Sequence, residues 1–142
     1  MIVLDTNVVS EPLRPEPDAA VVEWLNRQEP RTLYLTTVNL AELLAGIETL
    51  PAGRRRDALK QALTEQMMPL FEGRILAFDE PAAAAFARIN ASAMAAGNTI
   101  GFADGAIAAI ASAHGFMVAK RNVRDFKGTG VEVLNPWQAG IS

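Results

Sequence analysis

The sequence predicts an α/β protein of three layers, in which a central, mainly parallel β-sheet lies between two layers of helices. Two observations predict this fold. Short apolar runs alternate along the chain with longer segments whose apolar residues recur at helical spacing. The chain is also 142 residues long, 50% hydrophobic and 20% charged, which suits one folded core and excludes a disordered or fibrous protein. We therefore expect residues 1–142 to form a single domain.

The first half of the chain predicts strands and helices in alternation. The run Ile-Val-Leu at residues 2–4 predicts a buried strand, and the Asp-Thr-Asn that follows is typical of a turn. Three prolines then indicate a loop, after which Asp18 is placed to cap a helix through Trp24 and Leu25. Residues 33–36 predict a second strand, and apolar residues at helical spacing over 40–47 predict a helix that ends before Pro51.

The second half continues the alternation. The predicted elements are, in order, a helix at 52–68, a strand at 75–78, helices at 81–96 and 103–114, and strands at 117–119 and 131–134. Gly97 and Gly115 follow the last two helices, at the position where glycine commonly ends a helix.

Three acidic residues fall where such a fold binds its ligands. Asp5 directly follows the first strand, Glu42 lies in the helix after the second strand, and Asp104 lies in the first turn of a later helix. Each has an ordinary structural explanation: a turn, an exposed helix residue, and a carboxylate favoured by the helix dipole. Because ligands bind outside the carboxyl ends of parallel strands, their combination also indicates a functional site.

Five segments, in order from residue 2 to residue 137, carry a family resemblance. They are Ile-Val-Leu-Asp-Thr-Asn-Val-Val-Ser-Glu at 2–11, Val-Asn-Leu-Ala-Glu-Leu-Leu-Ala-Gly-Ile at 38–47, Ile-Gly-Phe-Ala-Asp-Gly-Ala-Ile-Ala-Ala at 100–109, Lys-Arg-Asn-Val-Arg-Asp-Phe at 120–126 and Leu-Asn-Pro-Trp at 134–137. The chain resembles PIN-domain ribonucleases, and most closely the toxins of VapBC-type toxin–antitoxin pairs. One such segment alone would be weak evidence, but five in the same order are strong.

The resemblance implies a three-layer α/β/α fold and an endoribonuclease in which one or two Mg²⁺ or Mn²⁺ ions activate water for hydrolysis of RNA. Asp5, Glu42 and Asp104 match its catalytic and metal-binding acids, and Asn122 matches a fourth metal position. Asp125 is a nearby reserve ligand or structural acid. The protein would be the toxin of a type II pair, inhibited by a small antitoxin protein, and a homodimer.

Elementary chemistry agrees with that site. Two carboxylates about 4 Å apart repel by roughly 4 kcal/mol at an effective dielectric near 20, so a trio of acids needs a cation or protons. Oxygen ligands, with no cysteine and one histidine in the chain, suit Mg²⁺ or Mn²⁺ better than zinc.

Binding of RNA must depend on local charge, because the net charge of the chain is −3. Two basic clusters exist: Arg54, Arg55, Arg56 and Lys60 form one, and Lys120, Arg121, Arg124 and Lys127 form the other. We predict that Thr6, Lys120, Arg121 and Arg124 contact the substrate. Lys120 departs from the family, whose members commonly have a small hydroxyl residue there. Its ammonium would either compete with the metal or contact the scissile phosphate.

Several other features have structural explanations. His114 is placed to complement a helix dipole, and Trp24 and Trp137 fit core or interface anchors. The five methionines fit ordinary core positions, and the sequence leaves open whether Met67, Met68, Leu70 and Phe71 form part of a dimer or antitoxin surface. The sequence has no cysteine, no signal-peptide pattern and no apolar run of membrane-spanning length, so we expect a cytoplasmic protein.

Two other classes of function compete with the ribonuclease. One is a binding module with the same fold that has lost catalysis, for example through Lys120. The other is a phospho-aspartate receiver domain, suggested by Asp5, Asp79 and Lys120, although receivers have an adjacent acidic pair after the first strand. A haloacid-dehalogenase-type phosphatase is excluded because Asn7 stands where a second aspartate is needed. Metal-dependent RNA cleavage identifies the enzyme, and phosphorylation of Asp79 identifies the receiver.

Overall fold

A sheet of five parallel strands forms the centre of the computed structural model, which describes residues 1–138. The strand order is β3-β2-β1-β4-β5, with bounds β1 (Ile2–Leu4), β2 (Leu33–Thr36), β3 (Ile75–Leu76), β4 (Met117–Ala119) and β5 (Val133–Leu134). The central strand is β1, in which Val3 lies between Tyr34 of β2 and Val118 of β4. Residues 139–142 of the predicted domain lie outside the described residues.

Helices connect the strands. Their bounds are α1 (Thr6–Ser10), α2 (Ala19–Arg27), α3 (Thr37–Glu48), α4 (Arg54–Gln61), α5 (Met68–Leu70), α6 (Glu80–Ala95) and α7 (Phe102–His114). Short 3₁₀ turns occur at η1 (Glu11–Leu13), η2 (Pro30–Thr32) and η4 (Val123–Phe126), and η3 (Ala62–Met67) has π-helical spacing. None of the described helices is both long and apolar enough to cross a membrane.

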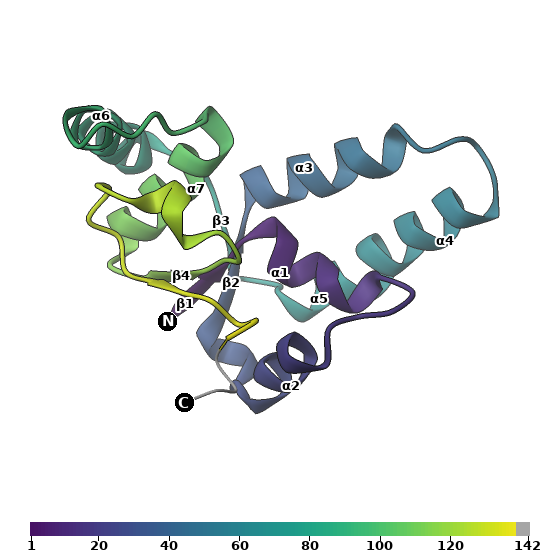
Figure 1. Ribbon diagram of the computed structural model, residues 1–142. Helices are drawn as coiled ribbons and strands as arrows, with labels where there is room; N and C mark the ends of the chain where they lie inside the picture. Colours follow the sequence, from purple (N-terminus) through teal and green to yellow (C-terminus); the bar gives the residue numbers. More distant parts are fainter. Residues whose placement is uncertain (139–142) are drawn as a thin grey trace.

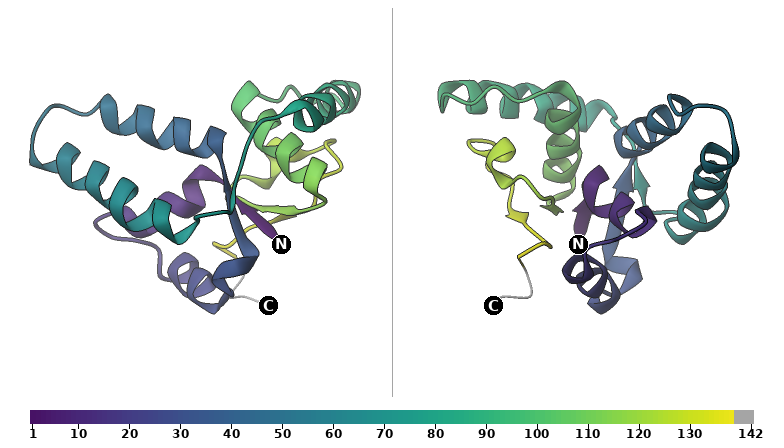
Figure 2. Two further views of the ribbon diagram at one scale, coloured as in Figure 1. Left: turned by 180° about the vertical axis from the view of Figure 1, so that it is seen from behind. Right: turned by 45° about the vertical axis from the view of Figure 1, so that its right-hand side comes forward.

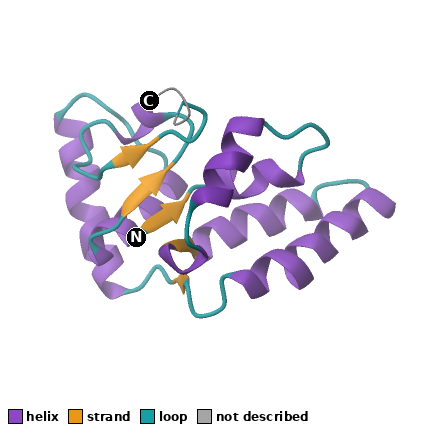
Figure 3. Cartoon of the chain, turned by 90° about the horizontal axis from the view of Figure 1, so that it is seen from below, coloured by secondary structure: helices purple, strands orange, loops and turns teal. Residues whose placement is uncertain are grey.

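The helices form two layers, one on each face of the sheet (Figures 1 and 3). Leu4 of β1 and Leu35 of β2 pack into a core with α1 to α5, whereas Val3 and Val118 pack into a second core with α6, α7 and η4. The hairpin of α3 and α4 extends away from the sheet, on the side opposite α6 and α7 (Figure 2). The predicted three-layer α/β fold is confirmed, and the sheet is parallel throughout the described residues.

Capping residues fix the starts of the helices. The carboxylate of Asp18 accepts a hydrogen bond from the N–H of Ala20 at 2.8 Å, which confirms the predicted cap of α2. Thr36 and Asn39 form a reciprocal capping box at the start of α3. Asp79 caps α6, and Gly115 ends α7 in the left-handed conformation, with φ of 70°. These local signals place α3 and α7, which carry two of the predicted acidic site residues.

Four predicted elements differ in detail. The expected turn after Asp5 is helix α1, and the long helix predicted at 52–68 starts at Arg54 and changes to π spacing at η3. Pro69 has no backbone N–H to donate to the carbonyl of Glu65, so regular α-helical bonding stops there. Strand β3 is shorter than predicted because Asp79 turns back to the carbonyl of Ala77, and β5 begins at Val133, later than the predicted 131.

Candidate active site

The predicted site residues gather at the carboxyl ends of β1, β2 and β4. Asp5 follows β1, Glu42 lies on α3 after β2, Asp104 lies in the first turn of α7, and Lys120 follows β4. The Lys120 ammonium is 3.9 Å from a carboxylate oxygen of Asp5 and 4.0 Å from one of Asp104. The structure therefore brings together acids that are about 100 residues apart in the sequence.

Asp5 is held rigidly by its backbone. Its N–H donates to the carbonyl of Ala119 at 2.9 Å, and its own carbonyl accepts from the N–H groups of Val8 and Val9 at the start of α1. The side chain makes no capping bond and is only 7% exposed. The backbone thus ties Asp5 to β4 and α1, and leaves the carboxylate for the acidic cluster.

A chain of hydrogen bonds orients Glu42. The hydroxyl of Thr6 donates to Oε1 of Glu42 at 2.6 Å, and the side-chain amide of Asn39 donates to the Thr6 hydroxyl at 3.0 Å. Asn39 is fully buried, and its Oδ1 accepts from both the N–H and the hydroxyl of Thr36. Thr6, predicted to contact the substrate, therefore also holds the Glu42 carboxylate in place. The role of Asn39 was not predicted, although the Thr-x-x-Asn capping pattern could have indicated it.

Lys120 is buried among carboxylates and an aromatic ring. Only 3% of its side chain is exposed, and its ammonium donates to Oδ2 of Asp125 at 3.2 Å. The ammonium also lies 5.0 Å from the centre of the Phe126 ring, within range of a cation–π interaction. Three carboxylates from three segments, Asp5, Asp104 and Asp125, thus surround one ammonium.

The pKa of the Asp5 carboxyl is perturbed chiefly by burial. Burial raises the pKa of the Asp5 carboxyl to about 6; the Lys120 ammonium opposes this rise, and the carboxylates of Asp104 and Glu42 add to it. Because burial is the largest cause, the raised pKa of Asp5 reflects chiefly the lost hydration of its carboxylate.

The other predicted residues of the β4–β5 segment take different positions. Asn122 is exposed at the start of η4, while Asp125 makes the contact with Lys120. Arg121 and Arg124 are exposed, and the guanidinium of Arg121 lies 5.1 Å from the centre of the Trp137 ring. The three substrate-binding residues predicted in this segment are therefore two exposed arginines and one buried lysine.

The donors suit a hard divalent cation, but the ammonium already lies among them. Carboxylate oxygens are the ligands that Mg²⁺ and Mn²⁺ prefer, and His114 lies at the far end of α7 from Asp104. Within residues 1–138, no three acidic or histidine side chains stand close enough together to enclose an ion. The carboxylate oxygens thus suit such an ion in their chemistry, but in this arrangement the Lys120 ammonium lies among them and they do not enclose one.

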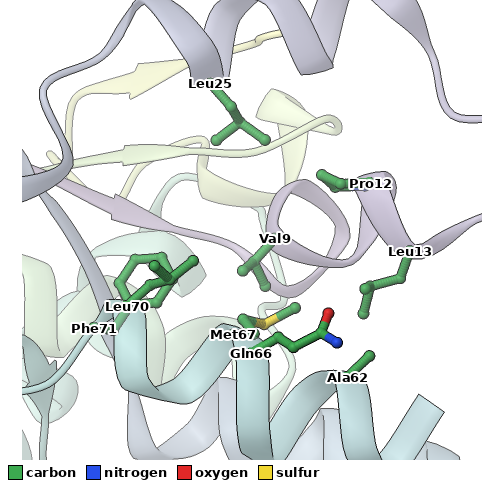
Figure 4. A pocket seen from close by; sticks show the side chains of 9 residues that line it. All are labelled: Val9, Pro12, Leu13, Leu25, Ala62, Gln66, Met67, Leu70 and Phe71. Carbon is green, nitrogen blue, oxygen red and sulfur yellow. The ribbon is translucent and has the colours of Figure 1, made fainter. Parts of the chain in front are cut away.

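Two of the hollows on the α1–α5 side of the molecule are lined by residues singled out in the sequence. A cleft of about 480 Å³ adjoins Glu42, between η1 and the α3–α4 hairpin, and its lining includes Arg14 and Arg55. A second pocket, of about 270 Å³, is lined by eight apolar residues and Gln66 (Figure 4). Met67, Leu70 and Phe71 line it, and Leu70 is 68% exposed. Of the four residues considered for a partner surface, Leu70 is exposed, whereas Met67 and Phe71 are buried in the core and Met68 packs against it. Trp24 is a buried core residue, as expected.

The chain is similar in sequence and in structure to known proteins. The PIN domain family matches residues 2–131. The VapC ribonuclease Y4jK of Sinorhizobium fredii is 46% identical, over 97% of this chain and 99% of its own length, and the toxin FitB of Neisseria gonorrhoeae is 46% identical over 96% and 99%. The solved structure of FitAB bound to an IR36 DNA fragment is similar with a TM-score of 0.93 and 44% identity, covering 96% of each chain.

Proposed function

This chain belongs to the PIN-domain family, and from that premise we propose that it is a Mg²⁺- or Mn²⁺-dependent endoribonuclease, the toxin of a type II toxin–antitoxin pair. Residues 1–142 form its one domain. The observation that carries the proposal is the convergence of Asp5, Glu42 and Asp104 at one edge of the sheet, where, among the described residues, the carboxylates outnumber the one ammonium within 4.0 Å of Asp5 and Asp104, that of Lys120. The names of the relatives, a VapC ribonuclease and a toxin, support the same activity.

The metal would be held by the carboxylates of Asp5, Asp104 and Glu42, with the amide oxygen of Asn122 as a further ligand. When bound, the ion supplies positive charge that activates water and stabilises the departing oxygen of the phosphodiester. Asp125, already bound to Lys120, is the nearest alternative acid to Asn122.

Glu42 is the group that orients the attacking water and accepts its proton. Its Oε1 is fixed by Thr6, and its Oε2 receives no hydrogen bond from any residue of the described chain. Attack of the water oxygen on phosphorus forms one P–O bond and breaks one P–O ester bond. The proton of the water passes to Glu42, and the departing oxygen takes a proton from solvent. Asn39 acts one step further back, because it positions the Thr6 hydroxyl.

Exposed arginines would bind the RNA backbone on both sides of the site. Arg121 and Arg124 lie on the β4–β5 side, and Arg14 and Arg55 line the cleft beside Glu42. These groups offset the net charge of −3 locally, so association should weaken as salt rises.

The partners follow from the toxin assignment. We propose a small cognate antitoxin protein, a homodimeric toxin, and action in the cytoplasm, where RNA is available. The similar structure of FitAB bound to a DNA fragment supports a partner for this chain, since that relative was solved as a complex. An unregulated ribonuclease would damage its host, so an inhibitor is also expected on mechanistic grounds.

The test is cleavage of total cellular RNA by the purified, antitoxin-free protein with Mg²⁺ or Mn²⁺. We expect discrete fragments that disappear with EDTA and in the Asp104→Ala variant, which keeps its circular dichroism spectrum. Asp104 is a suitable target because it lies at the partly exposed start of α7, so its removal should not disturb the core. Full cleavage by Asp104→Ala would refute the site, and no cleavage by folded, metal-loaded wild type would refute the activity.

The buried Lys120 favours one second candidate, a PIN-fold binding module without catalysis. Its ammonium lies at the centre of the acids, where it opposes binding of a metal. Such a module would bind RNA without cleaving it. The receiver domain has no structural support, because β2 separates β3 from β1 and the Asp79 carboxylate caps α6.

A further inference from the structure

The buried ammonium of Lys120 is the feature that the proposed hydrolysis leaves unused. It lies within 4.0 Å of Asp5, Asp104 and Asp125, which come from the end of β1, the start of α7 and η4. The backbone N–H of Lys120 is bonded to the carbonyl of Leu134 at 2.9 Å, which fixes the residue between β4 and β5. The position of this ammonium is therefore set by the sheet, unlike that of a surface lysine.

The Lys120 side chain is paired, through its ammonium, with the groups around it. Its strongest contact is the hydrogen bond to Asp125, and its ammonium faces the Phe126 ring. Only 3% of the Lys120 side chain is exposed, so the ammonium has little access to water. Its positive charge is therefore neutralised mainly by the neighbouring carboxylates. A buried charge is tolerated only when it is paired in this way.

The charges of the cluster set how many cations it can hold. Asp5, Glu42, Asp104 and Asp125 bring four negative charges when ionised, and Lys120 brings one positive charge. One divalent ion would leave a single net negative charge, whereas two would leave a net positive charge around the buried Lys120 ammonium. If Lys120 were neutral, two divalent ions would balance the four acids. Uncompensated positive charge at such short range is strongly disfavoured.

We infer that the Lys120 ammonium is a built-in cation that takes the place of one metal ion and limits this active site to a single divalent ion. This inference rests on the metal site proposed above. In it, Lys120 acts through the neighbouring carboxylates and does not touch the substrate. Lys120 thus neutralises Asp125 and Asp104 without a second metal, and it also ties η4 to the acidic cluster.

The test is a calorimetric titration of Mn²⁺ into the metal-free, full-length protein. We expect one Mn²⁺ per wild-type chain. In Lys120→Met, which keeps the apolar contact with Phe126 and loses the charge, we expect two sites, or a first site tightened about tenfold or more. Mn²⁺ should also raise the melting temperature of Lys120→Met by more than that of wild type. The control is Lys60→Met, which makes the same change in net charge at an exposed ion pair with Glu48 and should bind Mn²⁺ as wild type does.

Three results would overturn the inference: two Mn²⁺ ions bound by wild type, equal stoichiometry and affinity in wild type and Lys120→Met, or no binding by either. The first can be measured even if Lys120→Met does not fold. A gain in metal binding would contradict a purely structural role for Lys120, because loss of a structural contact does not create a cation site. Binding is measured without RNA, so an inactive wild type would refute the ribonuclease and leave this result standing.

Discussion

Replacing Asp5 with asparagine should stabilise the metal-free protein at neutral pH. The Asp5 carboxyl is buried, and its pKa is raised to about 6 from an ordinary 3.8. Asparagine has nearly the same shape as protonated aspartate and carries no charge. Asp5→Asn therefore removes the cost of holding a buried negative charge, while it keeps the packing at the end of β1.

The size and the sign of the effect follow from the two pKa values. Between pH 3.8 and about 6 the folded protein keeps a proton that the unfolded chain has released, so the stability of wild type falls as pH rises. Above pH 6 the full cost applies, and the difference between the pKa values corresponds to about 3 kcal/mol. Below pH 3.8 both states are protonated and the cost disappears. A gain of about 3 kcal/mol corresponds to roughly 6–12 °C in melting temperature for a chain of this size.

The assay is thermal unfolding followed by circular dichroism in EDTA, at pH 7.5 and at pH 4. Asp5→Asn should melt well above wild type at pH 7.5, and the gap should narrow strongly at pH 4. An equal gap at both pH values would show that the charge of Asp5 is not the cause. A variant that melts below wild type at pH 7.5 would refute the argument, because the ammonium of Lys120 would then outweigh burial.

Three other substitutions test the site and its support. Thr6→Val removes the donor to Glu42 and should lower kcat for RNA cleavage by about tenfold or more, while Thr6→Ser, which keeps the hydroxyl, should stay within a few fold of wild type. Asn39→Ala leaves buried partners unpaired and should lower the free energy of unfolding in urea by about 2–3 kcal/mol. Gly128→Ala should lower the free energy of unfolding by about 2 kcal/mol or more, because φ is +84° and the new Cβ would lie 2.8 Å from Cβ of Ala96. The matched control is Gly130→Ala, where φ is +77° and the space is open. It should lower the free energy of unfolding by only about 1 kcal/mol.

Local sequence signals were sufficient for much of the fold. The run at residues 2–4, the cap at Asp18 and the glycine after His114 each predict an element that the structure contains. Helix α1 was missed for a physical reason. Asp-Thr-Asn suits a turn as well as a helix start, and Val8 and Val9 are β-branched residues with weak helix propensity. Burial of both valines against the core decides in favour of the helix.

The sequence predicts the acidic residues of the candidate site but not the hydrogen bonds that hold them in place. Family motifs indicated Asp5, Glu42 and Asp104, but the bond from Thr6 to Glu42 joins residues 36 positions apart, and no local pattern contains it. Lys120 was recognised as unusual, yet the sequence left open whether it contacts substrate or competes with metal. Its burial between β4 and β5 and its bond to Asp125 favour the second. The burial of Lys120 and its contacts depend on the order of the strands in the sheet, which local sequence patterns do not show.

The most direct test of the central claim, that the acidic cluster directs water onto RNA, is cleavage in H₂¹⁸O followed by mass spectrometry of the fragment ends. Hydrolysis by water at this cluster should place one ¹⁸O in the single terminal phosphate that each cut creates, in wild type with Mn²⁺ and not in Asp104→Ala. Fragments that end in an unlabelled 2′,3′-cyclic phosphate would mean that the ribose hydroxyl is the nucleophile. They would contradict the assignment of Asp5, Glu42 and Asp104 as the groups that act on water.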